Sequence, residues 1–307
     1  MSKILVFGHR NPDTDAIGAA IGLAHLEAAL GSDVEAVALG RPSLETAFAL
    51  EHFGLDAPRV IETAAPAEVM LVDHNERQQS VADITDVTVL KVIDHHRIAN
   101  FETAAPLYMR VEPVGCTCTI LTRMYAENGI EIPRPQAGIM LSAIISDTLL
   151  FNSPTCTDAD RAAAAELADI AGVDVDEYGD ALLRAGTALG DEPVSAIIGR
   201  DSKSFDMGPK TVRVSQITTV DSAEILDRRD EFLTAMTAEK EAAGYDLYLL
   251  LITDVIKADS DLLVVGEPAS AIEQALGVTV ADGHAFGKGV VSRKKQIVPQ
   301  LTEVLDV

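Results

Sequence analysis

The chain has 307 residues, with 48 acidic and 24 basic side chains and a formal net charge of −24. This acidic balance argues against a nucleic-acid or anionic-membrane partner, because phosphate groups attract an excess of lysine and arginine. Hydrophobic residues make up 48% of the chain and charged residues 23%, which is typical of a globular protein, and the length allows two domains.

The apolar segments are too short for export or a membrane span. The N-terminal one covers only Ile4 to Phe7, and the most apolar long stretch, Ile139 to Phe151, contains Asp147. Three cysteines do not suggest a disulfide framework, and Cys116 and Cys118 form a C-x-C without the second pair of a zinc site. We therefore expect a cytoplasmic protein with small buried thiols.

Strands alternate with helices in the first half of the chain. Mostly apolar segments bounded by turn residues predict the strands, and apolar residues at helical spacing predict the helices. This alternation indicates an α/β fold with a parallel sheet covered on both faces. Strands are predicted at residues 3–8, 34–39, 59–61, 69–72, 87–93 and 106–111. Helices are predicted at residues 16–30, 43–53, 117–128, 135–150, 158–171 and 176–185.

A linker is predicted at Gly186 to Pro193, where the sequence GTALGDEP combines glycines, a proline and two acids. Beyond it, strands are predicted at 203–205, 211–217, 247–256 and 262–265, with helices at 223–243 and 269–276 and a terminal segment at 292–305. We therefore expect an N-terminal domain with a parallel sheet at 1–186, a linker at 187–193 and a smaller α/β domain with a mixed sheet at 194–307.

Polar clusters follow three of the predicted strands. His9, Asp13 and Asp15 lie in one loop after the first strand, Asp73 closes the strand at 69–72, and Asp94-His95-His96 closes the strand at 87–93. The carboxyl ends of parallel strands meet at one edge of a sheet, and ligands bind at that edge in open α/β folds. We therefore expect these side chains to converge.

Asp147 adds another acid near the end of an otherwise apolar helix. Carboxylates held close together raise one another's pKa unless a cation neutralises them. Several aspartates and two histidines can hold two divalent ions about 3.5–4 Å apart, an arrangement suited to attack on phosphorus. Each residue alone also has a structural interpretation, since Asp13 or Asp15 could cap the helix that starts at Ala16.

The positions of the histidines favour the metal site. Four of the seven fall at strand ends with an aspartate beside or near them: His9, His74, His95 and His96. We interpret His25 and His52, which lie within predicted helices, as structural. His74 is expected to support the metal ligands rather than to bind metal itself.

A basic cluster lies near the C-terminus, where Lys288, Arg293, Lys294 and Lys295 fall within eight residues. A run of charge is usually a solvated helix face. In a chain of net charge −24 we favour an anion site instead, because Arg293 can bind a phosphate group bidentately and lysines act as point charges. Lys203, just after the linker, is a weaker candidate for the same role.

These motifs resemble those of the DHH phosphoesterase superfamily: His9-x3-Asp13-x-Asp15, Asp73-His74-Asn75 and Asp94-His95-His96. The segment Ser292-Arg293-Lys294-Lys295-Gln296, with Pro299 and Leu301, resembles the second domain of family II (manganese-dependent) inorganic pyrophosphatases. The resemblance covers nearly the whole chain. It implies two α/β domains with the active site in the cleft between them, and a homodimer.

The resemblance also implies a role for each motif residue. One metal ion would be held by His9, Asp13 and Asp73. The other would be held by Asp15, Asp73, His95 and Asp147, so that Asp73 bridges the pair. Pyrophosphate would be bound by His96, Lys203, Arg293 and Lys294, the first three of which would act in catalysis. Asp94 would orient a histidine ligand.

The implied cofactors are two Mn²⁺ or Co²⁺ ions per subunit, with Mg²⁺ brought in alongside the substrate. The implied reaction is hydrolysis of inorganic diphosphate to two orthophosphates by a hydroxide that bridges the two ions. The alternatives are a DHH-type exopolyphosphatase or short-nucleotide phosphodiesterase, and a non-catalytic phosphate- or metal-binding protein. The segment Asp282 to Gly287 is closer to the pyrophosphatase pattern, and no ligand of the motif is missing. No inserted regulatory domain fits between Asp73 and Asp147 or at the linker, so control by adenine nucleotides is not expected.

Overall fold

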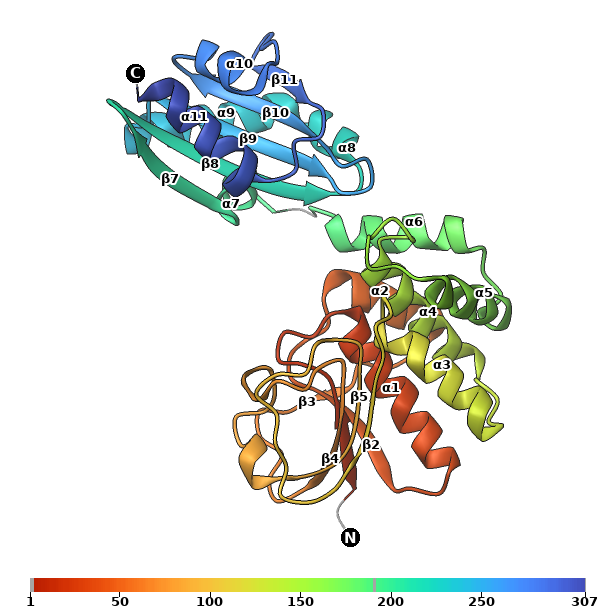
Figure 1. Ribbon diagram of the computed structural model, residues 1–307. Helices are drawn as coiled ribbons and strands as arrows, with labels where there is room; N and C mark the ends of the chain where they lie inside the picture. The colour runs from red at the N-terminus through yellow and green to blue at the C-terminus, as the bar shows by residue number, and fades with distance from the viewer. Residues whose placement is uncertain (1–2, 190–191, 307) are drawn as a thin grey trace. The chain divides into compact units, whose positions relative to one another are not determined.

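The structure is a computed structural model that describes residues 3–189 and 192–306. The chain forms two compact units, one that ends at Gly186 and one that begins at Thr187. Each unit has its own sheet and its own hydrophobic core (Figure 1). None of the described helices is both long enough and apolar enough to span a bilayer.

A six-stranded parallel sheet organises the first unit, in the order β3-β2-β1-β4-β5-β6. Its strands are β1 (Ile4–Phe7), β2 (Val34–Ala38), β3 (Arg59–Val60), β4 (Glu68–Val72), β5 (Thr88–Asp94) and β6 (Tyr108–Val111). The order changes direction between β1 and β4, so the carboxyl ends of these two strands flank the point where open α/β sheets bind ligands. The predicted parallel sheet is confirmed.

The helices of this unit gather on one face of the sheet, with α1 packed against β1, β2 and α4 (Figure 1). They are α1 (Thr14–Ala29), α2 (Leu44–Phe53), α3 (Thr117–Asn128), α4 (Arg134–Thr148), α5 (Asp158–Ala171) and α6 (Val175–Thr187). The other face is covered by connecting segments, which include the 3-10 turns η1 (Arg77–Gln79) and η2 (Ile84–Asp86). Phe7, Leu71 and Val92 pack there against Ile61 and Val81.

The second unit contains a five-stranded mixed sheet in the order β11-β10-β9-β8-β7, in which β8 and β9 are parallel and the other pairs antiparallel. Its strands are β7 (Ser202–Met207), β8 (Lys210–Thr219), β9 (Leu247–Asp254), β10 (Asp259–Gly266) and β11 (His284–Gly287). Its helices are α7 (Val194–Gly199), α8 (Ser222–Leu226), α9 (Arg229–Ala243), α10 (Ser270–Leu276) and α11 (Val298–Leu305), which follows a π-helical turn at Arg293–Ile297. The mixed sheet is as predicted.

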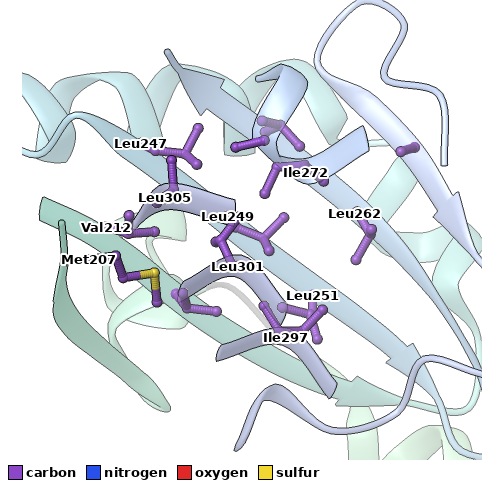
Figure 2. Packing of buried hydrophobic residues seen from close by; sticks show 14 of the residues in the cluster. Met207, Val212, Leu247, Leu249, Leu251, Leu262, Ile272, Ile297, Leu301 and Leu305 are labelled. Atoms are coloured by element: carbon purple, nitrogen blue, oxygen red, sulfur yellow. The ribbon is translucent and has the colours of Figure 1, made fainter. Parts of the chain in front are cut away.

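The central strand β9 is buried along its whole length, because helices pack on both faces of the sheet. Alternate side chains of a strand point to opposite faces. Leu247, Leu249 and Leu251 accordingly join the cluster formed with α10 and α11, as Figure 2 shows. Tyr248 and Leu250 join the cluster on the opposite face, which includes α7 and α9.

Two expectations need correction, and the expected linker is only partly described. The single helix predicted at 223–243 is wrong: α8 and α9 are separated at Asp227 and Arg228, where no side chain is buried to hold one straight helix against the sheet. Within the expected linker, Thr187 belongs to α6 and Leu189 is buried in the core of the second unit, while residues 190–191 lie outside the described residues. Cys116 and Cys118 are buried as expected, but Cys156 is only partly buried.

Candidate active site

Asp73 lies at the centre of the polar cluster. It follows β4 directly, and its amide donates to Ile93 O of the neighbouring β5 at 3.0 Å. Its backbone is in the left-handed region, with φ 57°, which a short polar residue tolerates better than a branched one. The side chain is 2% exposed, and its two oxygens lie 3.3 Å from His9 Nε2 and 3.3 Å from His95 Nε2.

His9 reaches this position through a tight connection between β1 and α1. A Cβ on Gly8 would lie 2.5 Å from Ala16 Cβ, so only glycine lets the end of the strand approach the start of the helix this closely. Asp13 then caps α1, because its Oδ1 accepts the Ala16 amide at 2.9 Å, while its Oδ2 lies 3.3 Å from His9 Nε2. Asp13 is therefore a helix cap and a neighbour of the cluster at the same time.

Asp15 is fully buried in the first turn of α1 and faces the start of α3. Its oxygens accept the amides of Thr117 at 2.7 Å and of Cys118 at 3.2 Å. Burial and the charge of Asp73 nevertheless raise the pKa of Asp15 to about 6. Asp147, near the end of α4, lies 4.0 Å from His95 Nε2 through an oxygen that has no hydrogen-bond partner among the described residues.

The charges of this cluster are only partly compensated. Burial, together with the charges of Asp15 and Asp73, raises the pKa of Asp147 well above its usual range. Burial acts to lower the pKa of His9 and His95, but their hydrogen bonds to carboxylates outweigh it and raise the two values to about 10 and about 9. The raised pKa of Asp147 and the raised pKa values of the two histidines indicate an excess of negative charge that a bound cation would neutralise.

The ligand atoms form groups small enough for single ions. Within each of the following groups the candidate atoms lie within 4.8 Å of one another: His9, Asp13 and Asp73; Asp15, His95 and Asp147; Asp73, His95 and His96; and Asp15, Cys116 and Cys118. Imidazole and carboxylate donors suit first-row divalent ions. The residues therefore fit a pair of such ions that shares Asp73, and the six residues expected as metal ligands all lie in these groups.

The neighbouring histidines differ from expectation in one respect. Asp94 is fully buried and its Oδ1 lies 3.0 Å from Nδ1 of His96, whereas Nδ1 of His95 lies 3.1 Å from Val114 O. Asp94 thus orients His96 and not the expected ligand His95. His74 is held by Val72 O at 2.9 Å and contacts no ligand side chain by a hydrogen bond among the described residues, so its supporting role stays a prediction.

In the second unit, the structure brings Arg293 next to the start of β7 and the middle of β8. Its guanidinium donates to Asp201 O at 2.7 Å, Asp201 Oδ1 at 2.6 Å and Val214 O at 3.3 Å. Val214 is the register partner of Lys203, so both cations belong to the same end of this hairpin. Lys294 is exposed beside Arg293 in the π-helical turn.

Comparisons with known proteins place the whole chain. Residues 3–144 match the DHH family N-terminal domain and residues 180–304 the DHHA2 domain. A protein of Enterococcus faecalis named "Probable manganese-dependent inorganic pyrophosphatase" is 58% identical, with all of both chains covered, and one of the same name from Shouchella clausii is 54% identical with 99% of each covered. The chain belongs to this pyrophosphatase family. The resemblance drawn from the motifs is confirmed.

Solved structures agree at the level of the fold. A protein of Methanococcus jannaschii assigned as a family II inorganic pyrophosphatase is 38% identical, with a TM-score of 0.63 and with 98% of this chain and 99% of that chain covered. An exopolyphosphatase-related protein of Bacteroides fragilis has a TM-score of 0.52 over 99% of this chain and 92% of its own. At 16% identity, the second likeness shows the fold alone.

Several residues that shape the site escaped the sequence reasoning. Asp160 of α5 is fully buried and accepts the Gly115 amide at 2.9 Å and the Thr119 hydroxyl at 2.6 Å, which fixes the segment that leads into α3. Asp201 holds Arg293, and Glu45 bonds to two hydroxyls beside the cluster. Their partners are distant in sequence, so no local pattern indicates them.

Proposed function

We propose that the chain hydrolyses inorganic diphosphate to two orthophosphates, the activity that the names of its relatives give to those proteins. The observation that carries the proposal is the position of Asp73, whose oxygens lie 3.3 Å from His9 Nε2 and from His95 Nε2. A carboxylate that presents one oxygen to each histidine can serve two ions at once, which is the requirement of two-metal phosphoryl chemistry.

The proposed cofactors are two Mn²⁺ or Co²⁺ ions per subunit, with Mg²⁺ entering alongside the substrate. The ligand sets would be His9, Asp13 and Asp73 for one ion, and Asp15, Asp73, His95 and Asp147 for the other. Three groups of ligand atoms support this assignment: the first set forms one group, Asp15, His95 and Asp147 form a second, and Asp73 lies with His95 in a third. When bound, such ions lower the pKa of a water molecule and offset the charge that develops on phosphorus.

His96 is the proposed proton donor to the leaving phosphate group. Asp94 Oδ1 lies 3.0 Å from His96 Nδ1 and also accepts the His96 amide at 3.0 Å, so the ring is fixed at that nitrogen. The side chain is 52% exposed, which leaves Nε2 free to donate a hydrogen bond to a substrate oxygen.

Lys203, Arg293 and Lys294 are the proposed anion-binding residues of the second unit, and we propose that they act on the same diphosphate as the metal ligands. Arg293 is preorganised by its bonds to Asp201 and Val214 O, so that little ordering is needed when a phosphate group binds. Fixed cations placed where negative charge develops stabilise the transition state.

Phosphate release from pyrophosphate, tripolyphosphate and a dinucleotide, each with Mn²⁺, Co²⁺ or Mg²⁺, tests the proposal. We expect a strong preference for pyrophosphate, because the proposed site combines metal ligands with a few cations for a compact anion. Comparable specific activity on tripolyphosphate or on the dinucleotide would favour the exopolyphosphatase or phosphodiesterase alternative. No release from any substrate would favour a binding protein. The Asp73→Asn variant, purified in the same way, controls for contaminating phosphatases.

We also propose that the protein is a cytoplasmic homodimer. The odd number of cysteines, three, supports a reducing compartment. Light scattering during size-exclusion chromatography tests the oligomer, since one chain has a mass of 32.6 kDa and a dimer would have twice that mass. A single peak at the mass of one chain would contradict the proposed dimer.

A further inference from the structure

The Glu45 carboxylate connects three helices beside the candidate metal cluster. It lies in the first turn of α2, and its Oε1 accepts a hydrogen bond from Thr14 Oγ1 of α1 at 2.6 Å and one from Ser146 Oγ of α4 at 2.5 Å. Burial raises the pKa of Glu45, although both hydroxyl bonds act in the opposite direction. A partly buried acid with two short bonds to other helices does more than place negative charge in the first turn of its own helix.

Both hydroxyls belong to residues next to candidate metal ligands. Thr14 lies between Asp13 and Asp15 in the sequence, and Ser146 immediately precedes Asp147. Thr14 and Asp15 share helix α1, and Ser146 and Asp147 share helix α4, so a restraint on the hydroxyl also restrains the backbone that carries the adjacent carboxylate. The bond network of Glu45 therefore ties the start of α1 to the end of α4.

The relative position of the start of α1 and the end of α4 determines whether one group of candidate ligand atoms stays close together. Asp15 and Asp147 belong to the group completed by His95. Asp15 is also held by two amides of α3, whereas one oxygen of Asp147 has no hydrogen-bond partner among the described residues. The Ser146 hydroxyl, directly before Asp147, thus links the end of α4 to α2.

We propose that Glu45 is a positioning residue that holds Asp147 in register with Asp15 and thereby sets the Mn²⁺ affinity of the group Asp15, His95 and Asp147. The inference deepens the proposed function and rests on it, since it adds a determinant of cofactor binding to the same site. Residues that orient metal ligands without touching the metal typically contribute a factor of about 10–100 in affinity or activity.

Gly186, the last residue of the first unit, supplies an independent way to move Glu45. A Cβ at this position would lie 2.9 Å from Glu45 Cβ and 2.9 Å from Glu45 Oε2. Alanine is favoured over glycine inside a helix, and Gly186 lies in α6. Gly186→Ala should therefore displace Glu45 without weakening α6, and it leaves every hydrogen-bonding group in place.

The test is titration of the metal-free protein with Mn²⁺ by calorimetry, with the rate of pyrophosphate hydrolysis measured in parallel. For Glu45→Ala we expect one of two Mn²⁺ sites to weaken by about 10–100-fold. Glu45→Gln should weaken it less, because the amide oxygen still accepts both hydroxyls. Ser146→Ala and Gly186→Ala should weaken the same site. Glu51→Gln, an exposed acid on the same helix α2, is the matched control and should bind Mn²⁺ as the unmodified chain does.

Coupling between the variants separates positioning from general loss of stability. Glu45→Ala and Ser146→Ala should not be additive in Mn²⁺ affinity, because they remove the two ends of one bond. If Glu45→Ala does not fold, Ser146→Ala, which removes a single hydroxyl, decides the question. Mn²⁺ affinities within twofold of the unmodified chain in the folded variants would overturn the proposal. If the variants bind Mn²⁺ more weakly and the unmodified chain hydrolyses no pyrophosphate, the positioning role is upheld and the proposed function is refuted.

Discussion

Arg293→Ala tests the anion-binding role assigned to the second unit. The Arg293 side chain is 18% exposed and is held by Asp201 and by Val214 O, so it is an ordered cation rather than a mobile surface group. Removing one preorganised donor from an active site costs about 10²–10³ in turnover. We expect a loss of that size, with Mn²⁺ binding intact because the metal ligands lie in the other unit.

The structural cost of this change is smaller than the catalytic one. The bonds of Arg293 join it to a 60% exposed carboxylate and to two backbone carbonyls, and such partly exposed interactions contribute about 1 kcal/mol. The variant should therefore stay folded at assay temperature. A loss of turnover with an almost unchanged melting temperature would assign the effect to catalysis.

The assay is steady-state kinetics with bound Mn²⁺ measured in parallel. Lys294→Ala should act in the same direction as Arg293→Ala, and the two should not add if both side chains bind one phosphate group. Lys295→Ala, an exposed neighbour in the same turn, is the control. Turnover and KM near those of the unmodified enzyme for Arg293→Ala would show that the basic cluster is only a solvated face. Loss of Mn²⁺ instead of turnover would show that Arg293 acts on the metal site.

Two further changes probe the first unit. Asp73→Asn should lower the Mn²⁺ retained after gel filtration at both sites together, because Asp73 lies between His9 and His95. Two retained equivalents of Mn²⁺ per chain with near-normal turnover would refute the bridging role. Asp160→Ala should lower the free energy of unfolding, measured by urea denaturation, by roughly 3–5 kcal/mol, because it removes a buried hydrogen-bond acceptor from Gly115, Thr119 and Thr157. A change under about 1 kcal/mol would contradict the structural role of Asp160.

The strands that build the candidate site were predictable because each carries a local signal. An apolar run that ends at Asp73 or at Asp94 can be recognised without knowledge of its neighbours, and parallel pairing then brings the two ends together. The strand predicted at 3–8 likewise ends just before His9, and its parallel pairing predicted His9 beside the other two strand ends. The predicted convergence therefore needed only the periodicity of each strand and the rule that ligands bind at the carboxyl edge.

The features that were missed depend on contacts between distant segments. Asp15 is held by amides that lie 102 and 103 residues further along the chain, and Ser146 lies 101 residues from Glu45. No periodicity encodes such contacts. The break between α8 and α9 was missed for the opposite reason: the local sequence favours a helix throughout 223–243, but no buried side chain at Asp227 or Arg228 holds one straight helix against the sheet.

The cluster of acids raises the question of how the first unit folds without metal. Asp15 is partly compensated by the amides of Thr117 and Cys118 at the start of α3, where the helix dipole also favours negative charge. Asp73 is compensated by His9 and His95, and Asp13 by His9 and the amide of Ala16. These partners are part of the chain, so we expect the metal-free protein to be folded.

The compensation is incomplete, and metal should therefore stabilise the first unit. One oxygen of Asp147 has no hydrogen-bond partner among the described residues, and burial together with neighbouring carboxylates raises the pKa of both Asp15 and Asp147. A ligand at 100 times its Kd that binds only the folded state adds about 2.7 kcal/mol per site, or roughly 5 kcal/mol for two sites.

Differential scanning calorimetry of chelator-treated and Mn²⁺-loaded protein measures this difference. At roughly 2–4 °C per kcal/mol for a unit of this size, two occupied sites should raise the melting temperature by about 10–20 °C. The chelated protein should still melt cooperatively, because its carboxylates keep their partners within the chain. Asp73→Asn should abolish most of the Mn²⁺-dependent shift. A chelated protein with no cooperative transition would show that the ions, and not His9, His95 and the start of α3, hold the acid cluster together.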